Sequence, residues 1–156
     1  MKTIIPNIVL PIIKNGISLE TNIANEFDNK KIVLFGIPGA FTPTCSEKHF
    51  PGYIKLFKQF KNKKIDEIYC LSVNDPYVMI SWLQSYSENN YINGIADGNA
   101  ELTKYLHLTS DKSKNFMGIR SNRFAMIVKG NKILKCFVEK PGELNVSSAE
   151  NILKEI

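Results

Sequence analysis

Residues 31–52 read KIVLFGIPGAFTPTCSEKHFPG, an apolar run followed by a proline-rich loop that carries a lone cysteine, Cys45. The run Lys31–Ile37 is almost continuously apolar, as is typical of a central strand covered on both faces. Beyond the loop, apolar residues recur at the spacing of one helical face: Tyr53, Leu56, Phe57 and Phe60. A buried strand that leads into an amphipathic helix predicts an α/β fold, with Cys45 between the two elements.

The following segments continue this alternation of strand and helix. A second apolar run at 68–73 ends at Asp75 and Pro76, which predict the N-cap and the first turn of a helix. The buried face of that helix is expected to be formed by Met79, Trp82, Leu83 and Tyr86. Residues 97–98 (Asp-Gly) mark a turn, and residues 111–120 are expected to form a loop. A short helix is expected between them, with the apolar residues Leu102, Tyr105 and Leu106.

The C-terminal part completes a recognisable order of elements. Residues 124–128 and 132–138 flank a Lys-Gly-Asn turn and predict an antiparallel hairpin. Residues 147–150 (SSAE) have the spacing of a capping box and predict the start of a final helix. Strand, helix, strand, helix, hairpin and helix is the order of the thioredoxin fold. We therefore expect one α/β domain, residues 1–156, with a thioredoxin-like fold. A central mixed sheet would be flanked by helices, with additions in mid-chain and at the N-terminus, where residues 1–13 predict an opening strand and turn.

Composition argues against several classes of protein. Hydrophobic residues make up 44% of the chain and charged residues 22%, which is ordinary for a globular protein. No run reaches the roughly 18 apolar residues of a membrane span, so no membrane partner is expected. The net charge is +5, but the densest cluster of lysines falls at an expected helix end, where cations complement the helix dipole. We interpret this cluster as a solvated surface and expect no nucleic-acid partner. Its members are Lys58, Lys61, Lys63 and Lys64.

The three cysteines, Cys45, Cys70 and Cys136, are an odd number without close spacing. They fit neither a disulfide-rich secreted scaffold nor a zinc site, and the two histidines are too few to complete one. We therefore expect no metal. A reducing compartment is the default for such a chain. The cytoplasm is expected, and an organelle matrix, reached with a transit peptide that is later removed, is the alternative.

The loop places Cys45 in a position that favours its anion. Thr42 is a good N-cap residue and Pro43 is favoured at the first helical position, which puts Cys45 at the third. The N–H groups of a first turn lack partners within the helix, so a thiolate is stabilised there. The Thr42 hydroxyl can donate to the sulfur or to a bound oxygen, and Pro38 shapes the loop without an N–H of its own. The alternative is a cysteine that packs as a small hydrophobe.

Two further residues, Pro51 and His49, bear on the structure and chemistry of this turn. The ring of Pro51 would clash with the carbonyl of Glu47 in a regular helix, so we expect a kink or a division of the helix there. Cys45 would then lie on a short turn that can separate from the rest. His49, four residues after Cys45, is either its base or co-ligand, or a satisfied core or capping histidine.

Both arginines of the chain, Arg120 and Arg123, stand just before the expected strand at 124–128. Arginine offers a charged planar fork that lysine does not imitate. In a thioredoxin-like sandwich the start of this strand can lie beside the loop after the first strand. An arginine there would stabilise the thiolate of Cys45 and orient a polar substrate. The alternative is a pair of ordinary surface cations.

The pattern Pro38-x-x-x-Thr42-x-x-Cys45 resembles the active-site motif of the peroxiredoxins. The surrounding sequence resembles the peroxiredoxin-5 subfamily, which includes the plant type II enzymes. The matching segments span nearly the whole chain: HFPG at 49–52, CLSVND at 70–75, Trp82, ADG at 96–98, MGIRS at 117–121, RF at 123–124 and VSSA at 146–149.

This resemblance implies a thiol-dependent peroxidase of hydrogen peroxide and alkyl hydroperoxides that serves cell redox homeostasis without a cofactor. Cys45 would attack the peroxide O–O bond and become a sulfenic acid. Thr42 and Arg123 would bind the peroxide, Pro38 would shield the sulfur, and Arg120 would support the site. The resemblance also suggests a homodimer built around the active-site end, with candidate contacts at Pro43, Thr44 and Phe116.

The chain departs from vertebrate relatives in how Cys45 would be regenerated. Their resolving cysteine aligns with Val146, so that disulfide is not expected here. Cys70 matches the second cysteine of the plant type II enzymes and is a candidate resolving residue, although its strand is strongly apolar. Cys136 is expected to be structural. We therefore expect an atypical one-cysteine centre that is recycled by glutathione with glutaredoxin or by thioredoxin.

Two other functions remain open at this point. A thiol–disulfide oxidoreductase is disfavoured, because Lys48 stands where the second cysteine of a Cys-x-x-Cys pair would be. A non-catalytic interaction protein, such as a redox sensor or a chaperone-like relative, would be inert towards stoichiometric peroxide.

Overall fold

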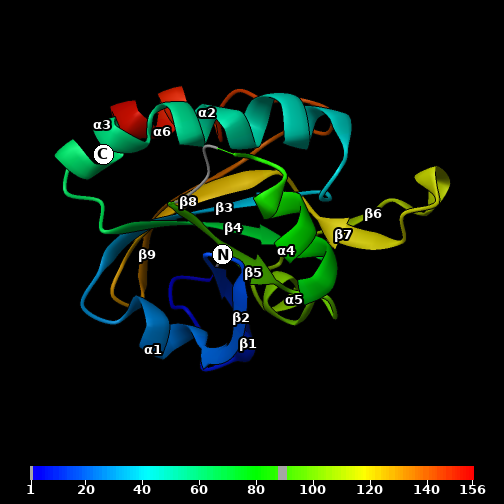
Figure 1. Cartoon of the computed structure of the whole chain (residues 1–156), viewed down its shortest axis with the longest axis horizontal. Helices are drawn as coiled ribbons and strands as arrows, with labels where there is room; N and C mark the ends of the chain where they lie inside the picture. The colour runs from blue at the N-terminus through cyan, green and yellow to red at the C-terminus, as the bar shows by residue number, and fades with distance from the viewer. Residues whose placement is uncertain (1, 88–90) are drawn as a thin grey trace.

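The computed structural model describes residues 2–87 and 91–156, and within these residues seven strands form one mixed sheet (Figure 1). The order of the strands is β2-β1-β5-β4-β3-β8-β9. Strands β3, β4 and β5 run parallel, and the pairings at both ends of the sheet are antiparallel. The strands are β1 (Val9–Lys14), β2 (Ile17–Asn22), β3 (Lys31–Ile37), β4 (Glu67–Ser72), β5 (Ile92–Ala96), β8 (Phe124–Lys129) and β9 (Lys132–Val138).

Helices cover both faces of this sheet. One buried cluster joins the sheet to α2, α3, α4 and α6, and a second joins its other face to α1 and α5. Figure 1 shows α2, α3 and α6 on one side of the sheet and α1 and α5 on the other. The helices are α1 (Ile23–Phe27), α2 (Phe50–Lys55), α3 (Phe57–Asn62), α4 (Pro76–Gln84), α5 (Glu101–Tyr105) and α6 (Ala149–Glu155). This is the expected thioredoxin-like arrangement, and no helix among the described residues is long and apolar enough to cross a membrane.

Strand β3 has the bounds that its apolar run predicts. Its side chains alternate between the two clusters, with Phe35 in one and Leu34 in the other, so both faces of the strand are buried. The start of α4 is also as expected, since the Asp75 carboxylate accepts a hydrogen bond from the Val78 N–H at 2.9 Å and Pro76 is the first helical residue. The predicted hairpin is formed by β8 and β9.

The middle of the chain differs from the sequence prediction. Residues 111–120, expected to be a loop, contain a 3₁₀ turn (Ser113–Asn115) and the strand β7 (Ile119–Ser121), which pairs with β6 (Thr109–Asp111). Phe116 lies at the tip of this second hairpin and is 98% exposed. Strand β5 was not expected because its run is short and contains Gly94. A Cβ at Gly94 would lie 2.7 Å from a Leu83 methyl group, so close packing of α4 requires a glycine there.

Two helix boundaries also differ. The single helix expected over 53–60 is divided at Leu56, which ends α2 and precedes α3. The final helix is capped by the Ser148 hydroxyl, which accepts from the Asn151 N–H at 3.2 Å, rather than by the capping box that starts at Ser147. The Ser147 hydroxyl donates instead to Glu139 at 2.7 Å. Ser147 therefore does not cap α6 as its spacing predicts, because its hydroxyl is bound to Glu139.

Candidate active site

The loop after β3 carries the predicted motif at the carboxyl end of that strand. The Ala40 N–H donates to the side-chain oxygen of Asn74, at the end of β4, across 3.0 Å. Helical hydrogen bonding starts where it was expected, because the Ser46 N–H donates to the Thr42 carbonyl at 3.0 Å. The Thr42 hydroxyl, which was expected to donate to the sulfur or to a bound oxygen, donates to the Gly39 carbonyl at 2.6 Å. Its oxygen lone pairs are therefore the part that remains to bind a substrate.

Cys45 opens a π-helical turn, Cys45–His49, in which the Phe50 N–H donates to the Cys45 carbonyl five residues back. Pro51 lies two residues beyond this turn and has no N–H to donate to Glu47. The wider turn lets the chain pass the proline ring without the clash of a regular α-helix. The irregularity that Pro51 predicts thus takes the form of a π turn that carries the cysteine.

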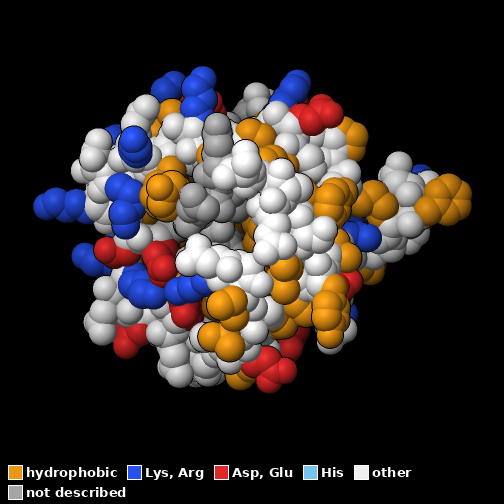
Figure 2. Space-filling view, in the orientation of Figure 1, with side chains coloured by type: hydrophobic (Ala, Val, Ile, Leu, Met, Phe, Trp, Pro, Cys, Tyr) orange, Lys and Arg blue, Asp and Glu red, His pale blue; other side chains and the backbone are white. Residues whose placement is uncertain are grey.

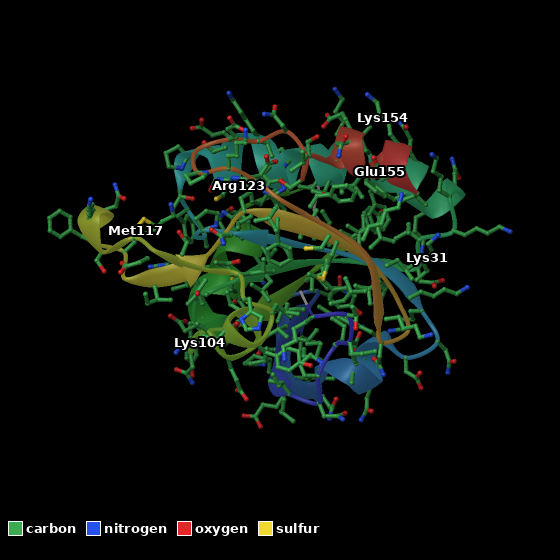
Figure 3. All side chains as sticks on the ribbon, turned by 180° about the vertical axis from the view of Figure 1, so that it is seen from behind. Lys31, Lys104, Met117, Arg123, Lys154 and Glu155 are labelled. Atoms are coloured by element: carbon green, nitrogen blue, oxygen red, sulfur yellow. The ribbon has the colours of Figure 1, made fainter. Side chains whose placement is uncertain are left out.

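The Cys45 side chain is 1% exposed and lies beside Arg123. The Nη2 of Arg123 donates to the Cys45 sulfur across 3.3 Å. Arg123 reaches it because β8 pairs antiparallel with β3, with Phe124 opposite Gly36. Figure 3 shows Arg123 between the sheet and the helical layer above it. The structure therefore brings together two residues that stand 78 positions apart in the sequence.

His49 is held on both of its ring nitrogens. Nδ1 faces Nη1 of Arg123 at 3.1 Å, and Nε2 faces the Ser147 carbonyl at 3.1 Å. A guanidinium only donates and a carbonyl only accepts, so the proton of the ring is on Nε2 and Nδ1 is the acceptor. Burial and, next, the charge of Arg123 lower the pKa of His49 to about 3. A neutral ring whose two nitrogens both have partners has no free nitrogen with which to act as the base of Cys45.

Arg120 supports the surrounding loops rather than the sulfur. Its Nε donates to the Met117 carbonyl at 2.8 Å, and its Nη1 donates to the Val73 carbonyl at 3.3 Å. These bonds tie the β6–β7 hairpin to the end of β4. A Cβ at Gly39 would lie 3.2 Å from Arg120 Nη1, so the active-site loop also packs closely against this side chain.

A cavity of about 270 Å³ opens beside these groups. Its walls come from the active-site loop, from the β6–β7 hairpin and from the segment after β9. They include Pro38, Thr42, Met117, Arg123 and Lys140. A small molecule can therefore meet Thr42 and Arg123 from one side. Among the described residues, no group of three or more His, Cys, Asp and Glu side chains is arranged to hold a metal ion.

The other two cysteines lie in different surroundings. Cys70 is fully buried in β4, opposite Phe35 of β3 and Gly94 of β5. Burial, reinforced by the nearby Cys45, raises the pKa of the Cys70 thiol well above its ordinary value. Cys136 is half-buried on β9, and burial raises the pKa of its thiol to about 11. Both are free thiols that stay protonated at neutral pH.

Sequence reasoning missed the groups that hold the cysteine turn, which come from α4 and from Tyr86. The helix ends at Gln84, so Tyr86, expected on its buried face, lies just beyond it. Trp82 donates its indole N–H to the Ser46 hydroxyl at 3.0 Å, and Tyr86 donates its hydroxyl to the Ser46 carbonyl at 2.6 Å. The sequence signal was the i, i+4 spacing of these two aromatics, which predicts a buried face but says nothing of its polar atoms. Glu139, which anchors Ser147, gave no sequence signal at all.

Comparison with known proteins finds relatives that match most of the chain. A model of the family "Redoxin" matches residues 3–153. Peroxiredoxin-2B of Arabidopsis thaliana is 49% identical over 127 residues, which cover 81% of this chain and 78% of the relative. The hybrid peroxiredoxin hyPrx5 of Haemophilus influenzae is 42% identical over 131 residues, which cover 82% of this chain and 54% of the relative.

Two solved structures show the same likeness over nearly the whole chain. Reduced Prx3 from Vibrio vulnificus in complex with H₂O₂ is 41% identical with a TM-score of 0.91, and the match covers 97% of this chain and 95% of that one. The 1-Cys peroxiredoxin from Plasmodium falciparum is 37% identical with a TM-score of 0.91, and the match covers both chains completely.

Proposed function

Because the chain belongs to the redoxin family, as a peroxiredoxin similar to the plant type II and peroxiredoxin-5 proteins, we propose that it reduces hydrogen peroxide and alkyl hydroperoxides at Cys45. The enzyme is a thiol-dependent peroxidase. The observation that carries the assignment of Cys45 is its 3.3 Å contact with Arg123 Nη2 at the wall of the cavity. A fixed guanidinium beside the sulfur also lies where charge develops as the sulfur attacks.

The proposed reaction begins when the Cys45 thiolate attacks one peroxide oxygen. A sulfur–oxygen bond forms as the O–O bond breaks, and the sulfur, oxidised by two electrons, becomes a sulfenic acid. The other oxygen leaves with the electron pair, takes up a proton, and departs as water or an alcohol. Arg123 donates hydrogen bonds to the oxygens on which charge develops. The Thr42 hydroxyl, whose hydrogen is committed to Gly39, accepts the peroxide O–H.

Pro38 completes the proposed site without competing for the substrate. It lines the same cavity and has no N–H that would bind the sulfur or the peroxide. Arg120 does not contact the sulfur in the proposal. Its hydrogen bonds to the Met117 and Val73 carbonyls hold the loops around the site in place.

An external thiol would regenerate Cys45. The sulfenic acid condenses with this thiol to a mixed disulfide and water. A second thiol then attacks the sulfur of the first, so the two depart joined by a disulfide bond and Cys45 is released as a thiolate. Glutathione with glutaredoxin, or thioredoxin, supplies these thiols in the proposal. The protonated, fully buried Cys70 is a poor nucleophile in the folded chain, which favours an external reductant over Cys70 as the resolving residue.

The proposal also includes a cytoplasmic homodimer built at the active-site end, with an organelle matrix as the alternative compartment. Hydrophobic side chains stand at the tip of the β6–β7 hairpin, which projects from the body (Figure 2). Phe116 is exposed at this tip, and Phe41 is exposed in the loop that carries Cys45. Phe116→Ser is expected to shift the protein towards monomer in analytical ultracentrifugation, and an unchanged monomer or dimer in both proteins would contradict this contact.

The test of the peroxidase assignment is stoichiometric oxidation followed by steady-state turnover. One equivalent of hydrogen peroxide should add one oxygen to the wild-type mass at Cys45, and Cys45→Ser should lose both this addition and turnover. Cys70→Ser and Cys136→Ser serve as matched controls that should keep turnover with glutathione and glutaredoxin. Loss of turnover in a folded Cys70→Ser variant would assign the resolving role to Cys70, and inertness of Cys45 would remove the assignment.

A further inference from the structure

Glu139 is a buried carboxylate that the proposed reaction does not use. It follows β9 directly, is 8% exposed, and donates its backbone N–H to the Arg123 carbonyl at 2.9 Å. Within residues 2–87 and 91–156 it forms no ion pair with a lysine or arginine. A buried carboxylate without a cation needs several hydrogen-bond donors to stay ionised.

One oxygen of Glu139 receives these donors from a single short segment. Oε2 accepts from the Asn145 N–H at 2.6 Å, from the Ser147 N–H at 2.8 Å and from the Ser147 hydroxyl at 2.7 Å. Burial alone would raise the pKa of Glu139, but these donors hold it below its ordinary value. The carboxylate thus fixes both the backbone and the side chain of Ser147.

The carbonyl of the fixed Ser147 faces His49 and Tyr53, on the turn of Cys45 and the helix after it. That oxygen accepts from His49 Nε2 at 3.1 Å and from the Tyr53 hydroxyl at 2.7 Å. The first bond sets both the tautomer of His49 and the angle of its ring. The Nδ1 lone pair then points at Arg123 Nη1, 3.1 Å away. Because the guanidinium is planar and rigid, an acceptor on Nη1 also fixes Nη2, which lies 3.3 Å from the sulfur.

We propose that Glu139 is a positioning residue for peroxide reduction, acting through Ser147 and His49 on Arg123. This inference rests on the proposed roles of Cys45 and Arg123. Without the carboxylate, three donors of the 145–147 segment lose their shared acceptor, and the Ser147 carbonyl loses its fixed place. His49 is then free to turn, and Arg123 loses the acceptor that aims it at the substrate. A small misplacement of a substrate-binding group is enough to slow a reaction by about a hundredfold.

The experiment measures the rate at which one equivalent of hydrogen peroxide oxidises Cys45, by rapid quench and intact mass. Glu139→Ala is expected to lower this rate by about tenfold to a hundredfold. Glu139→Gln, which keeps a neutral acceptor, should lie between Glu139→Ala and the wild type. The matched control is Ser148→Ala, which removes the α6 cap from the same segment but none of the contacts to Glu139 or His49. It should leave the rate within about twofold.

A double-mutant cycle with Arg123 separates positioning from a general structural role. If Glu139 acts through Arg123, adding Glu139→Ala to an Arg123→Ala protein should cause no further loss of rate. An equal loss in both backgrounds would overturn the proposal, and so would a wild-type rate in Glu139→Ala. Should Glu139→Ala fail to fold, as judged by circular dichroism, the same cycle is run with Glu139→Gln.

The cycle also distinguishes this inference from the proposed function. If wild-type Cys45 does not react with peroxide, the proposed function is wrong. If Arg123→Ala reacts at the wild-type rate, the proposed role of Arg123 is wrong. If wild type is fast, Arg123→Ala is slow and Glu139→Ala is fast, only the positioning role of Glu139 is lost.

Discussion

Nη1 of Arg123 donates to Nδ1 of His49 across 3.1 Å, which places a fixed positive charge against a buried imidazole. Burial and this charge lower the pKa of His49 from 6.5 to about 3. In the unfolded chain the ring takes up a proton near pH 6.5, so between about pH 6.5 and 3 the unfolded state binds more protons than the folded state. The contribution of His49 to stability is therefore complete above pH 6.5 and is lost as the pH falls towards 3.

His49→Gln should accordingly flatten the fall in unfolding free energy between pH 6.5 and pH 3. Urea unfolding of both proteins at several pH values in this window measures the difference in slope. His107→Asn is the matched control, because His107 is exposed and asparagine tolerates its positive φ of 58°. Equal slopes for wild type and His49→Gln would contradict the assignment of a buried neutral ring.

Arg123→Lys should lower the rate of Cys45 oxidation by about a hundredfold, as removal of a preorganised donor does in other active sites. The point charge of lysine does not reproduce a fork that reaches the Cys45 sulfur and His49 together. Peroxide oxidation under single-turnover conditions measures the loss. Arg120→Lys should lower the rate much less, because Arg120 donates to two backbone carbonyls and not to the sulfur. Similar losses in the two variants would count against a special role for Arg123.

Tyr86→Phe should loosen the turn that carries Cys45, because it removes the donor to the Ser46 carbonyl. The expected cost in unfolding free energy is about 1 kcal/mol. The oxidised protein should also react faster with dimedone, a probe of sulfenic acids, since the turn separates more readily. Tyr77→Phe is the control, because it removes the same hydroxyl from an exposed side chain on α4, the helix that precedes Tyr86. Unchanged stability and an unchanged dimedone rate would show that this hydrogen bond does not restrain the turn.

Gly36→Ala should destabilise the fold by about 1–3 kcal/mol, the usual cost of overpacking a core. Its Cβ would lie 2.0 Å from the ring of Phe124, the residue opposite it on β8. Gly52→Ala is the contrasting variant, because its Cβ would meet only the Cβ of Ala149, at an ordinary 3.7 Å. An alanine inside α2 should stabilise the protein by about 0.5–1 kcal/mol. Thermal or urea unfolding gives both values, and a stable Gly36→Ala protein would refute the packing of β8 on β3.

The features that the sequence alone determined are those whose causes are local. The apolar run of β3 predicts its own bounds, and Asp75 with Pro76 predicts the start of α4. Cap chemistry and side-chain periodicity act within a few residues, so they can be read without the fold. The irregular turn before Pro51 belongs to the same class, because the missing N–H is a property of proline itself.

Tertiary structure decided whatever depends on a distant partner. Ser147 gives up a predicted cap because Glu139 binds it, and His49 is neutral because Arg123 and the Ser147 carbonyl meet its two nitrogens. The Cys45–Arg123 contact depends on the pairing of β8 with β3, which no local pattern encodes. The sequence by itself identifies Cys45, Thr42 and Arg123 as candidate site residues. Their distances and protonation states follow only from sheet pairing and burial, because both arise from contacts between segments far apart in the chain.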